Sequence, residues 1–558
     1  MRKFMLPALV LLILFYSCEN KIKFDIIVRN GVIYDGTGNK PYNGDVGINA
    51  DTIAAIGDLH NVKATTDIDA KGMAVSPGFI DVQSQSMSSL IQDGRSMAAI
   101  KQGVTLEVFG EGESMGPLTD TLKKIEQSAE GDIKYGISWN TLEEYLEFLQ
   151  QRGVSTNVAS FLGAATVREN LLLFANRAPD SAELSKMKLL TKQAMEDGAL
   201  GIGSALIYVP GNFAKTPELI ELCKVAASYG GVYISHIRSE GNQLLQAADE
   251  LITISKEAHI PAMFYHLKAA GKDNWYKMDP LIAKIDSANK SGLDISACMY
   301  PYTAGATGFD AAMPPYVQEG GLDKWVERLK DPAIRKKVSK EMVTPSNEWE
   351  NLYLSVGGSQ NIICIGFKQD SLKYLTGKRL SEIAKMRNKS PEETILDLII
   401  QDHSRIEVIY FMMSEDNVKK EIKLPYTSFG SDEASTAPEG VFLKSSAHPR
   451  AYGTFAKLLG QYVRDEKLIS LEEAVHKLSG LPATQLHLKK RGILLDGNYA
   501  DLVVFDPATI KANSTYENPH QFATGVIDVF VNGTQVLKDG NHTEAKPGRV
   551  VHGPGYKH

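Results

Sequence analysis

The feature that most constrains the fold is a long alternation of short apolar segments and helical patterns in the middle of the 558-residue chain. Eight apolar segments fit the strands of a parallel sheet, and each precedes a helical pattern or a loop that could lead to one. They are GVTLEVFG (103–110), VSTNVASFLG (154–163), GALGIGSAL (198–206), GVYISHI (231–237), PAMFYHL (261–267), GLDISACMYP (292–301), SRIEVIYF (404–411) and TSFGSD (427–432). Eight such units predict an α/β fold, a (β/α)8 barrel of the TIM type over residues 77–489, with its catalytic face at the carboxyl ends of the strands.

The two ends of the chain carry β patterns instead. Residues 22–76 include DIIVRNGVIYDGTG, with a hairpin-type turn at Asn30-Gly31, and residues 490–550 include YADLVVFDP and VIDVFVNGTQVLKDG. Each segment is too small to close a core alone. We therefore expect both ends to form one small β-sandwich together.

One stretch interrupts the predicted barrel. Residues 313–373 contain MPPYVQEGG, a charged helical pattern and an aromatic loop. A long addition between a barrel strand and the next helix typically covers the mouth of the barrel. We expect this insertion to act as a lid and to shape what the site accepts.

The amino terminus has the pattern of an export signal. Arg2 and Lys3 precede a short apolar run, which ends at Ser17-Cys18 and is too short to span a membrane. A cysteine at this position resembles a bacterial lipobox, so residues 1–18 predict a lipoprotein signal with lipid on Cys18. The alternative is an ordinary signal peptide or an anchor. Either way we expect an exported protein, periplasmic or at the cell surface, and in the first case tethered to a membrane surface.

The net charge and the positions of the cysteines limit the kinds of partner and of cysteine chemistry that we expect. The net charge of −7 argues against nucleic acid as a partner. Cys223, Cys298 and Cys364 lie in apolar runs and predict buried thiols rather than a disulfide framework or a cysteine metal cluster.

Two of the predicted strands end in the same way. VYISHIRSEG places His236 directly after an apolar run, and MFYHLKAAG places His266 in the same position, thirty residues later. This spacing fits one strand–helix–strand unit, and the carboxyl ends of adjacent parallel strands meet at one edge of the sheet. Neutral imidazole is the commonest side-chain metal ligand. Two histidines that merely cap strands are the alternative, but Arg238 and Lys268, each two residues further on, favour a functional site.

Taken in order, these segments resemble a known family. DIIVRNGVIYDGTG, GMAVSPGFIDVQSQS, GVTLEVFGEG, GIGSALIYVPG, HIRSEG, HLKAAG, YPYTA, FGSD, HPRAYGTFAKLLG, YADLVVFDP and VIDVFVNG resemble motifs of the amidohydrolase superfamily, and within it of the D-aminoacylase (N-acyl-D-amino-acid deacylase) group. The resemblance covers nearly everything after the signal. It implies a metal-dependent barrel with a small β-sandwich that hydrolyses amide bonds.

The metal ligands that the resemblance implies are incomplete in this chain. The family usually carries His-x-His after PGFIDV, but Gln83 and Gln85 stand there, and Gly112 replaces a cysteine of the D-aminoacylases. Some N-acetylglucosamine-6-phosphate deacetylases of the same superfamily also lack His-x-His and resemble single-metal enzymes with one Glu and two His as ligands. The chain offers that set as His236 and His266 with Glu111, or with Glu113 as the fallback. We therefore expect one zinc ion and doubt a second site; a solvated acidic loop is the alternative for the glutamates.

The resemblance also implies roles for other residues. Asp432 matches the catalytic aspartate, which takes a proton from the zinc-activated water and delivers it to the leaving nitrogen, although an aspartate at a strand end can simply cap a loop. Tyr208 matches a tyrosine thought to hold substrate, and ordinary packing is its alternative. The carboxylate of an N-acylated amino acid calls for a cation, so we expect Arg238 and Lys268 to bind substrate.

The roles of three residues, Arg238, His448 and Arg450, remain open at this point. A structural salt bridge is an equal alternative for Arg238. His448 and Arg450, in SSAHPR, either line the site or brace the last barrel unit, and we favour bracing.

Three functions compete. The leading hypothesis is a metal-dependent amide hydrolase, an N-acyl-D-amino-acid deacylase, acting on a small-molecule N-acyl amino acid or a related amide. The first alternative is a cyclic amidase or dipeptidase on the same fold. The second is a surface lipoprotein with a decayed site that only binds a ligand, and the loss of histidine at both glutamine positions is the argument for it. The oligomeric state stays open.

Overall fold

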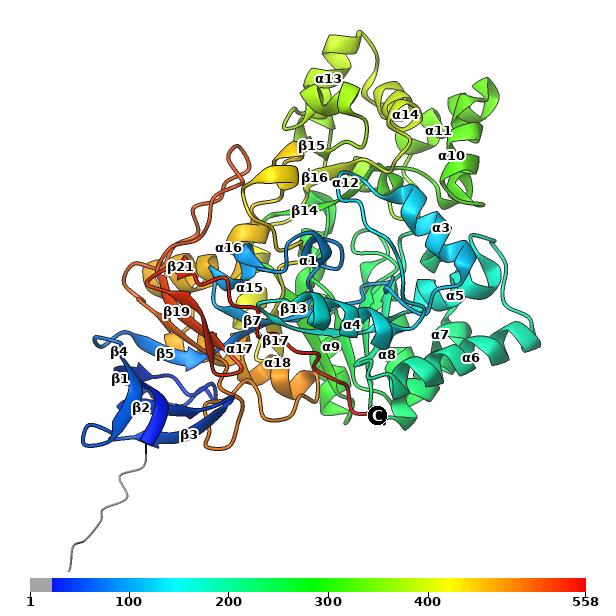
Figure 1. Ribbon diagram of the computed structural model, residues 1–558. Helices are drawn as coiled ribbons and strands as arrows, with labels where there is room; N and C mark the ends of the chain where they lie inside the picture. Colours follow the sequence, from blue (N-terminus) through cyan, green and yellow to red (C-terminus); the bar gives the residue numbers. More distant parts are fainter. Residues whose placement is uncertain (1–22, 558) are drawn as a thin grey trace, which may run out of the picture.

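The computed structural model describes residues 23–557 (Figure 1). The predicted export signal, residues 1–18, and Cys18 lie outside this range. No helix within residues 23–557 combines the length and the apolar character that crossing a bilayer would require. Cys223, Cys298 and Cys364 are buried free thiols, as expected.

Eight parallel strand positions form the centre of the molecule. They are β6 (Phe79–Asp81), β7 (Val104–Phe109), β8 (Asn157–Ser160) continued by β9 (Leu162–Gly163), β10 (Gly201–Ala205), β11 (Val232–His236), β12 (Ala262–Phe264), β13 (Ile295–Met299) and β17 (Thr427–Phe429). Neighbours pair in the order β6–β7–β8 and β9–β10–β11–β12–β13–β17. The amide of Val82 donates to the carbonyl of Phe429 at 3.4 Å, which joins the first strand to the last. The fold is therefore a (β/α)8 barrel.

Helices on the outside of the barrel connect its strands. They are α1 (Ser89–Gln92), α2 (Met97–Ile100), α3 (Asp120–Ala129), α4 (Leu142–Arg152), α5 (Ala164–Leu172), α6 (Ser181–Glu196), α7 (Thr216–Ser228), α8 (Leu244–Ala258), α9 (Met278–Lys290), α15 (Glu415–Lys423), α16 (Arg450–Lys457), α17 (Leu471–Leu478) and α18 (Gly480–Gln485). Several start at sequence signals that satisfy the first free amides; Thr141 with Glu144, and Asp180 with Glu183, form capping boxes. One helix, α8, fills the interval between β11 and β12, as the spacing of the two histidines predicted.

Glycine allows close packing inside the barrel wall. A Cβ on Gly203 in β10 would lie 1.9 Å from the carbonyl oxygen of Gly110, and one on Gly201 would lie 1.8 Å from that of Val232. No other residue fits at these points without moving the neighbouring backbone. The glycines of GALGIGSAL thus let β10 sit against the segments that carry the site.

One of the eight predicted barrel strands was wrong. SRIEVIYF contains β16 (Glu407–Phe411), which pairs antiparallel with β14 (Ala304–Gly308) and β15 (Ile362–Gly366) outside the barrel. The missing barrel strand is β6, at the start of the chain's first α/β unit. It has only three residues, so its apolar pattern is too short to distinguish it from the sandwich strands before it.

The insertion is longer than the expected segment 313–373. It occupies the chain between β13 and α15 and contains the antiparallel sheet β14–β16–β15. Its helices are α10 (Leu322–Lys330), α11 (Pro332–Met342), α12 (Leu352–Ser355), α13 (Leu380–Arg387) and α14 (Pro391–Asp402). A buried apolar cluster holds these elements together, including Trp325, Leu396 and Tyr410. The insertion lies at the top of Figure 1, beside the barrel.

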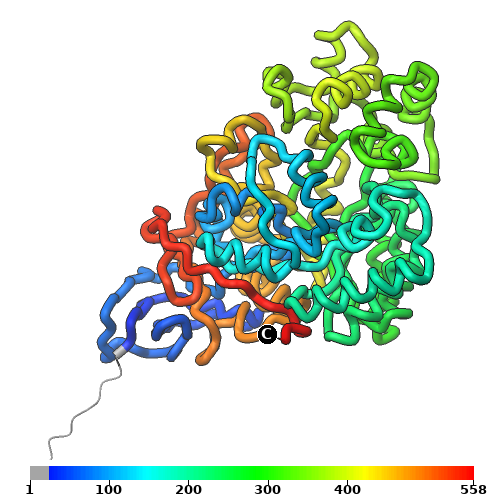
Figure 2. The backbone as a smooth tube through the Cα atoms, turned by 45° about the vertical axis from the view of Figure 1, so that its right-hand side comes forward, coloured from blue at the N-terminus to red at the C-terminus, as the bar shows by residue number. Residues whose placement is uncertain are grey.

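The two chain ends meet in a separate sheet. Its strands are β1 (Lys23–Ile33), β2 (Tyr42–Asn49), β3 (Thr52–Gly57), β4 (Lys63–Asp69), β5 (Ala74–Pro77), β18 (Leu502–Phe505), β19 (Val526–Val531), β20 (Thr534–Lys538) and β21 (Asn541–His542). β5 pairs antiparallel with β18, so that Val75 faces Val504 across the junction. In Figure 2 the blue and red ends of the chain lie together beside the barrel, as expected for a small β-sandwich built from both ends.

Candidate metal centre and active site

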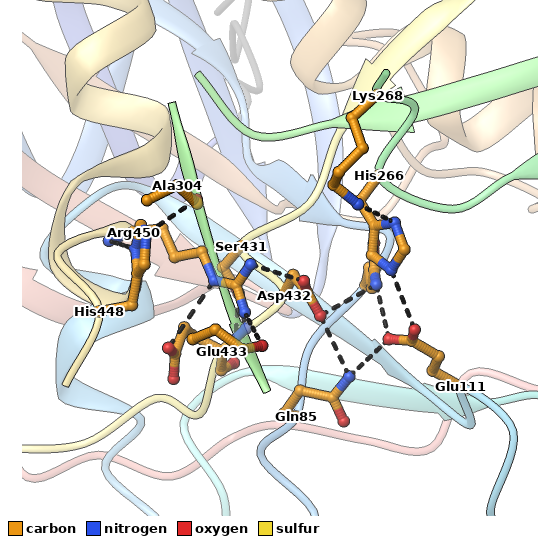
Figure 3. Close-up of polar contacts among 12 residues, drawn as sticks. Gln85, Glu111, His266, Lys268, Ala304, Ser431, Asp432, Glu433, His448 and Arg450 are labelled. Carbon is orange, nitrogen blue, oxygen red and sulfur yellow. Dashed lines mark hydrogen bonds and ion pairs between the residues drawn. The ribbon is translucent and has the colours of Figure 1, made fainter. Parts of the chain in front are cut away.

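The candidate site lies at the carboxyl ends of four barrel strands, β7, β11, β12 and β17 (Figure 3). His236 is the last residue of β11, and His266 follows β12 by two positions. Glu111 follows β7 by two positions, and Asp432 follows β17 by three. Parallel strands direct the residues beyond their ends to one rim, so four side chains from distant parts of the sequence meet there.

Glu111, His236 and His266 form the core of the site. Their ligand atoms all lie within 4.8 Å of one another. Oε1 of Glu111 is 3.0 Å from Nε2 of His266 and 3.2 Å from Nδ1 of His236. The two imidazole rings stand almost perpendicular, with their centroids 4.5 Å apart. Two imidazole nitrogens and one carboxylate oxygen that converge in this way are a donor set that fits one zinc ion.

Two glutamines occupy the side of Glu111 that faces away from the histidines. Nε2 of Gln83 donates to Oε2 of Glu111 at 2.6 Å and to Oδ1 of Asp432 at 3.0 Å. Nε2 of Gln85 donates to the same two oxygens at 2.8 and 3.3 Å. Oε1 of Glu111 therefore contacts the two imidazoles, and its Oε2 accepts hydrogen bonds from the two glutamine amides. At the two positions where the resemblance implies histidines, this chain bridges two carboxylates with hydrogen bonds.

Asp432 is held from two sides. Its Oδ1 accepts the glutamine hydrogen bonds, and its Oδ2 forms an ion pair with Nη1 of Arg450 at 2.7 Å. The backbone of Asp432 is in the left-handed region, with φ of 53°, and His266 also has positive φ, at 30°. Such conformations cost about 1–3 kcal/mol each and persist where surrounding contacts enforce them, as at functional sites.

A second glutamate lies behind the histidines. Oε1 of Glu240 is 3.0 Å from Nδ1 of His266 and 2.7 Å from Nζ of Lys268, and its Oε2 is 3.7 Å from Nε2 of His236. Sequence reasoning missed this residue, although its position in HIRSEG, four residues after the first histidine, is the signal that could have found it. The histidine pair is therefore enclosed between Glu111 and Glu240.

The charges of the site oppose the effect of burial. Burial favours the neutral acid, but the two imidazoles hold the pKa of Glu111 well below its ordinary value. Burial also raises the pKa of Asp432, reinforced by Glu111 and opposed by Arg450. Burial and Lys268 act to lower the pKa of His266, yet Glu240 and Glu111 raise it to about 9. A divalent cation at this ring would compete with that proton, so its binding would release protons.

The predicted substrate residues have different surroundings. The ring of Tyr208 packs edge-on against that of His236, with centroids 5.2 Å apart, so it borders the site. Lys268 lies beside His266, with Nζ 2.6 Å from Nδ1, but its ammonium is already paired with Glu240. Its substrate role and that of Tyr208 stay predictions.

Arg238 does not face the cluster. Its Nε and Nη2 donate to Glu250 at 2.8 and 2.9 Å, and its Nη1 and Nη2 donate to the carbonyls of Asn212 and Ala214. Every guanidinium nitrogen is engaged by the loop after β10 and by α8. These contacts favour the alternative of a structural salt bridge over the prediction that Arg238 binds substrate.

The expectation for SSAHPR was half right. His448 is fully buried and bonds through Nε2 to the carbonyl of Ala304 at 2.9 Å, which holds the segment after the last barrel strand against β14 of the insertion. Arg450, in contrast, contacts Asp432 directly and stacks over the ring of Tyr300, 4.4 Å from its centroid. Glu113, the fallback ligand, is exposed and lies outside the cluster.

The insertion supplies part of the surroundings of the site. A cavity of about 420 Å³ is lined by Glu433, next to Asp432, together with Glu407 of β16 and Glu126 of α3. Nearby, the guanidinium of Arg405 lies 4.9 Å from the ring of Tyr208 and is half exposed, with Asp310 as its ion-pair partner. The ring of Tyr208 therefore contacts both Arg405 of the insertion and His236 of the candidate metal site.

Comparison with known proteins gives the same assignment. The model of the amidohydrolase family matches residues 427–537. The D-aminoacylase of Alcaligenes xylosoxydans xylosoxydans is 32% identical over 531 residues, which cover 95% of this chain and 97% of that protein.

Two solved structures extend the comparison to the fold. A D-aminoacylase studied for its binuclear metal centre, with activation by one metal and attenuation by a second, is 32% identical with a TM-score of 0.78, and the match covers 95% of this chain and 100% of that one. The N-acyl-D-glutamate deacylase of Bordetella bronchiseptica, complexed with zinc and a phosphonate inhibitor, is 28% identical with the same TM-score and the same coverage. The chain therefore belongs to the amidohydrolase family, in its D-aminoacylase group, and is a metal-dependent hydrolase of amide bonds.

Proposed function

We propose that the protein is an N-acyl-D-amino-acid deacylase that uses a single zinc ion and Asp432 as the proton-transferring residue. The observation that carries this proposal is the convergence of one carboxylate and two imidazoles beside Asp432. The substrate class is supported by relatives that are named for action on N-acyl D-amino acids and that match nearly the whole chain.

Oε1 of Glu111, Nδ1 of His236 and Nε2 of His266 are the atoms that would hold the ion. Zinc supplies a Lewis acid that polarises the amide carbonyl and lowers the pKa of a water molecule to roughly 7. Asp432 takes the proton of the attacking water and delivers it to the nitrogen that leaves. Its paired contacts to the glutamines and Arg450 fix the direction of both oxygens, which proton transfer requires.

The glutamine pair supports the count of one ion. An amide nitrogen donates hydrogen bonds and has no lone pair to offer a metal. Because Gln83 and Gln85 direct their NH2 groups at Glu111 and Asp432, they meet the negative charge that a second cation would otherwise meet. One similar D-aminoacylase structure is described as having a binuclear centre in which one metal activates and a second attenuates, and we infer that one ion suffices here.

A substrate screen with zinc analysis tests the proposed function. The purified protein should contain close to one equivalent of zinc and should hydrolyse N-acetyl D-amino acids faster than the L-forms. Asp432→Asn should keep the zinc but lose about 100- to 10,000-fold in kcat, the range for a removed general acid–base group, whereas His266→Ala should lose both. Cyclic amides and dipeptides belong in the same screen. A metal-free protein without amidase activity would instead favour a ligand-binding surface protein.

We also propose that the protein is exported and carries lipid on Cys18. The charged start, the short apolar run and the cysteine after it support this. Metabolic labelling with a radioactive fatty acid tests it. Label should enter the wild type and should be absent from Cys18→Ser; an unlabelled wild type found free outside the cell contradicts lipidation.

A further inference from the structure

We propose that Glu107 is a positioning residue for proton transfer: through two serine hydroxyls it fixes the segment that presents Gln83 and Gln85 to Asp432. The proposal rests on the proposed function, since Asp432 is the residue whose direction is set, and Glu107 acts there only through other residues. It follows from the contacts of a buried carboxyl group in the barrel wall that the proposed reaction does not itself use.

Glu107, in β7, accepts hydrogen bonds from four hydroxyls and is 1% exposed. Its Oε2 accepts from Ser84 at 2.8 Å and from Ser86, and its Oε1 accepts from Thr156 at 2.9 Å and from Ser96. An ionised carboxylate has about four acceptor sites, so these four donors satisfy it. Burial of a carboxylate is costly unless its oxygens are hydrogen-bonded, so the three segments that carry the hydroxyls are held against β7.

The segment from Gln83 to Ser86 has different partners on its two faces. The side chains of Gln83 and Gln85 donate to the two carboxylates of the candidate site. Those of Ser84 and Ser86, which alternate with them in the sequence, donate to Glu107 instead. Glu107 therefore holds the rear face of the segment whose front face carries the glutamine pair.

Ser86 also connects Glu107 to the loop that follows β17. Its Oγ donates to Glu107 and accepts from the amide of Ser435 at 2.8 Å. Between the same two segments, the amide of Asp432 donates to the carbonyl of Gln83 at 2.7 Å. A shift of Ser86 would therefore displace the glutamine pair and the proton-transferring residue together.

Two matched hydroxyl deletions test the proposal. Ser86 and Thr156 are both fully buried and both donate to Glu107, so Ser86→Ala and Thr156→Val should lose similar stability. Only Ser86 lies between Glu107 and the candidate site. Ser86→Ala should lower kcat about 10- to 100-fold, the upper value being the cost of misplacing a catalytic group by roughly 1 Å, with KM and zinc content unchanged. Thr156→Val should keep kcat within about a factor of two, well below that cost.

Removal of the acceptor tests whether Ser86 acts through Glu107. Glu107→Leu should lower kcat to a similar extent as Ser86→Ala. Adding Ser86→Ala to Glu107→Leu should then reduce kcat little further, because the hydroxyl has already lost its anchor. Independent losses that multiply in the double variant would overturn the proposed connection.

Hydrogen exchange followed by mass spectrometry gives a measurement that does not depend on activity. Peptides that span residues 82–87 and 430–436 contain the amides of Gln85 and Asp432, which donate across the two segments. These peptides should exchange about tenfold faster in Ser86→Ala than in the wild type or in Thr156→Val.

The outcomes separate this proposal from the proposed function. Equal exchange or equal kcat in Ser86→Ala and Thr156→Val would overturn the role of Glu107, even if Glu107→Leu does not fold. The expected difference in exchange, found in a protein whose wild type has no amidase activity, would refute the proposed function alone.

Discussion

Nη1 of Arg450 lies 2.7 Å from Oδ2 of Asp432, in an ion pair buried beside the candidate metal centre. Arg450 acts against the burial that raises the pKa of this aspartate. It also keeps one carboxylate oxygen occupied, so that the other faces the glutamines. The arginine thus sets both the charge and the direction of the residue proposed to move the proton.

Removal of this cation should change the pH dependence of the reaction. Asp432 must be ionised to accept a proton, so activity falls as the pH drops through its pKa. Arg450→Met removes the stabilising charge, which raises that pKa and should move the acidic limb of the kcat/KM profile to higher pH by about 1–3 units. Arg450→Lys retains a charge and should shift the limb less. An unmoved limb in Arg450→Met would show that another group controls it.

The glutamine pair can be exchanged for the residues usual in the family. Gln83→His together with Gln85→His supplies two lone pairs beside Glu111 and Asp432, so this double variant should bind a second zinc ion when excess metal is present. Metal analysis after gel filtration measures the stoichiometry. Gln83→Asn with Gln85→Asn is the control that retains amides, and it should stay at one equivalent. Two equivalents in the wild type would contradict the proposed ion count.

Arg238→Met should affect stability rather than substrate binding. The variant leaves Glu250 and two carbonyls without their donors, which should lower the free energy of unfolding by about 1–3 kcal/mol. We expect the zinc content and the KM to stay within about a factor of two, well below the tenfold that 1.4 kcal/mol represents. Chemical denaturation and steady-state kinetics measure the two effects. A large rise in KM without loss of stability would restore its predicted role in substrate binding.

Arg405→Met, in contrast to Arg238→Met, should affect substrate binding rather than stability. Arg405 is half exposed beside Tyr208, where the carboxylate of an N-acyl amino acid could reach it. Losing one charge-assisted hydrogen bond there costs about 1.5 kcal/mol, so Arg405→Met should raise KM roughly tenfold with little change in kcat. An N-acyl amino-acid amide, which has no carboxylate, is the control substrate and should show a smaller effect. Equal effects on both substrates would place the carboxylate elsewhere.

Strand-end residues were the predictable part of the site. A histidine directly after a parallel strand must lie on the barrel rim, so the meeting of His236, His266, Glu111 and Asp432 follows from the alternating pattern. Side chains two residues further on were less predictable. Arg238 and Lys268 occupy equivalent positions in the sequence, yet one turns to α8 and the other to Glu240. Backbone direction after a strand depends on the loop, which periodicity does not reveal.

The fold shows a similar limit. The number of strands in the barrel followed from the pattern, but the pattern did not distinguish a buried barrel strand from a buried antiparallel strand. SRIEVIYF is apolar because β16 lies in the middle of the sheet of the insertion, between β14 and β15. Its pairing partners are distant in sequence, which no local signal records. The three-residue strand β6 was missed for the converse reason, because it is too short for any periodicity.

The junction between β5 and β18 has a consequence for how the protein is made. More than four hundred residues separate these two partners, and the whole barrel is synthesised between them. Until the last sixty or so residues have emerged, β5 is an unpaired edge available to other chains. Newly made protein should therefore depend on a chaperone until late in synthesis. Chains that end before Leu502 should aggregate even though every barrel strand is present.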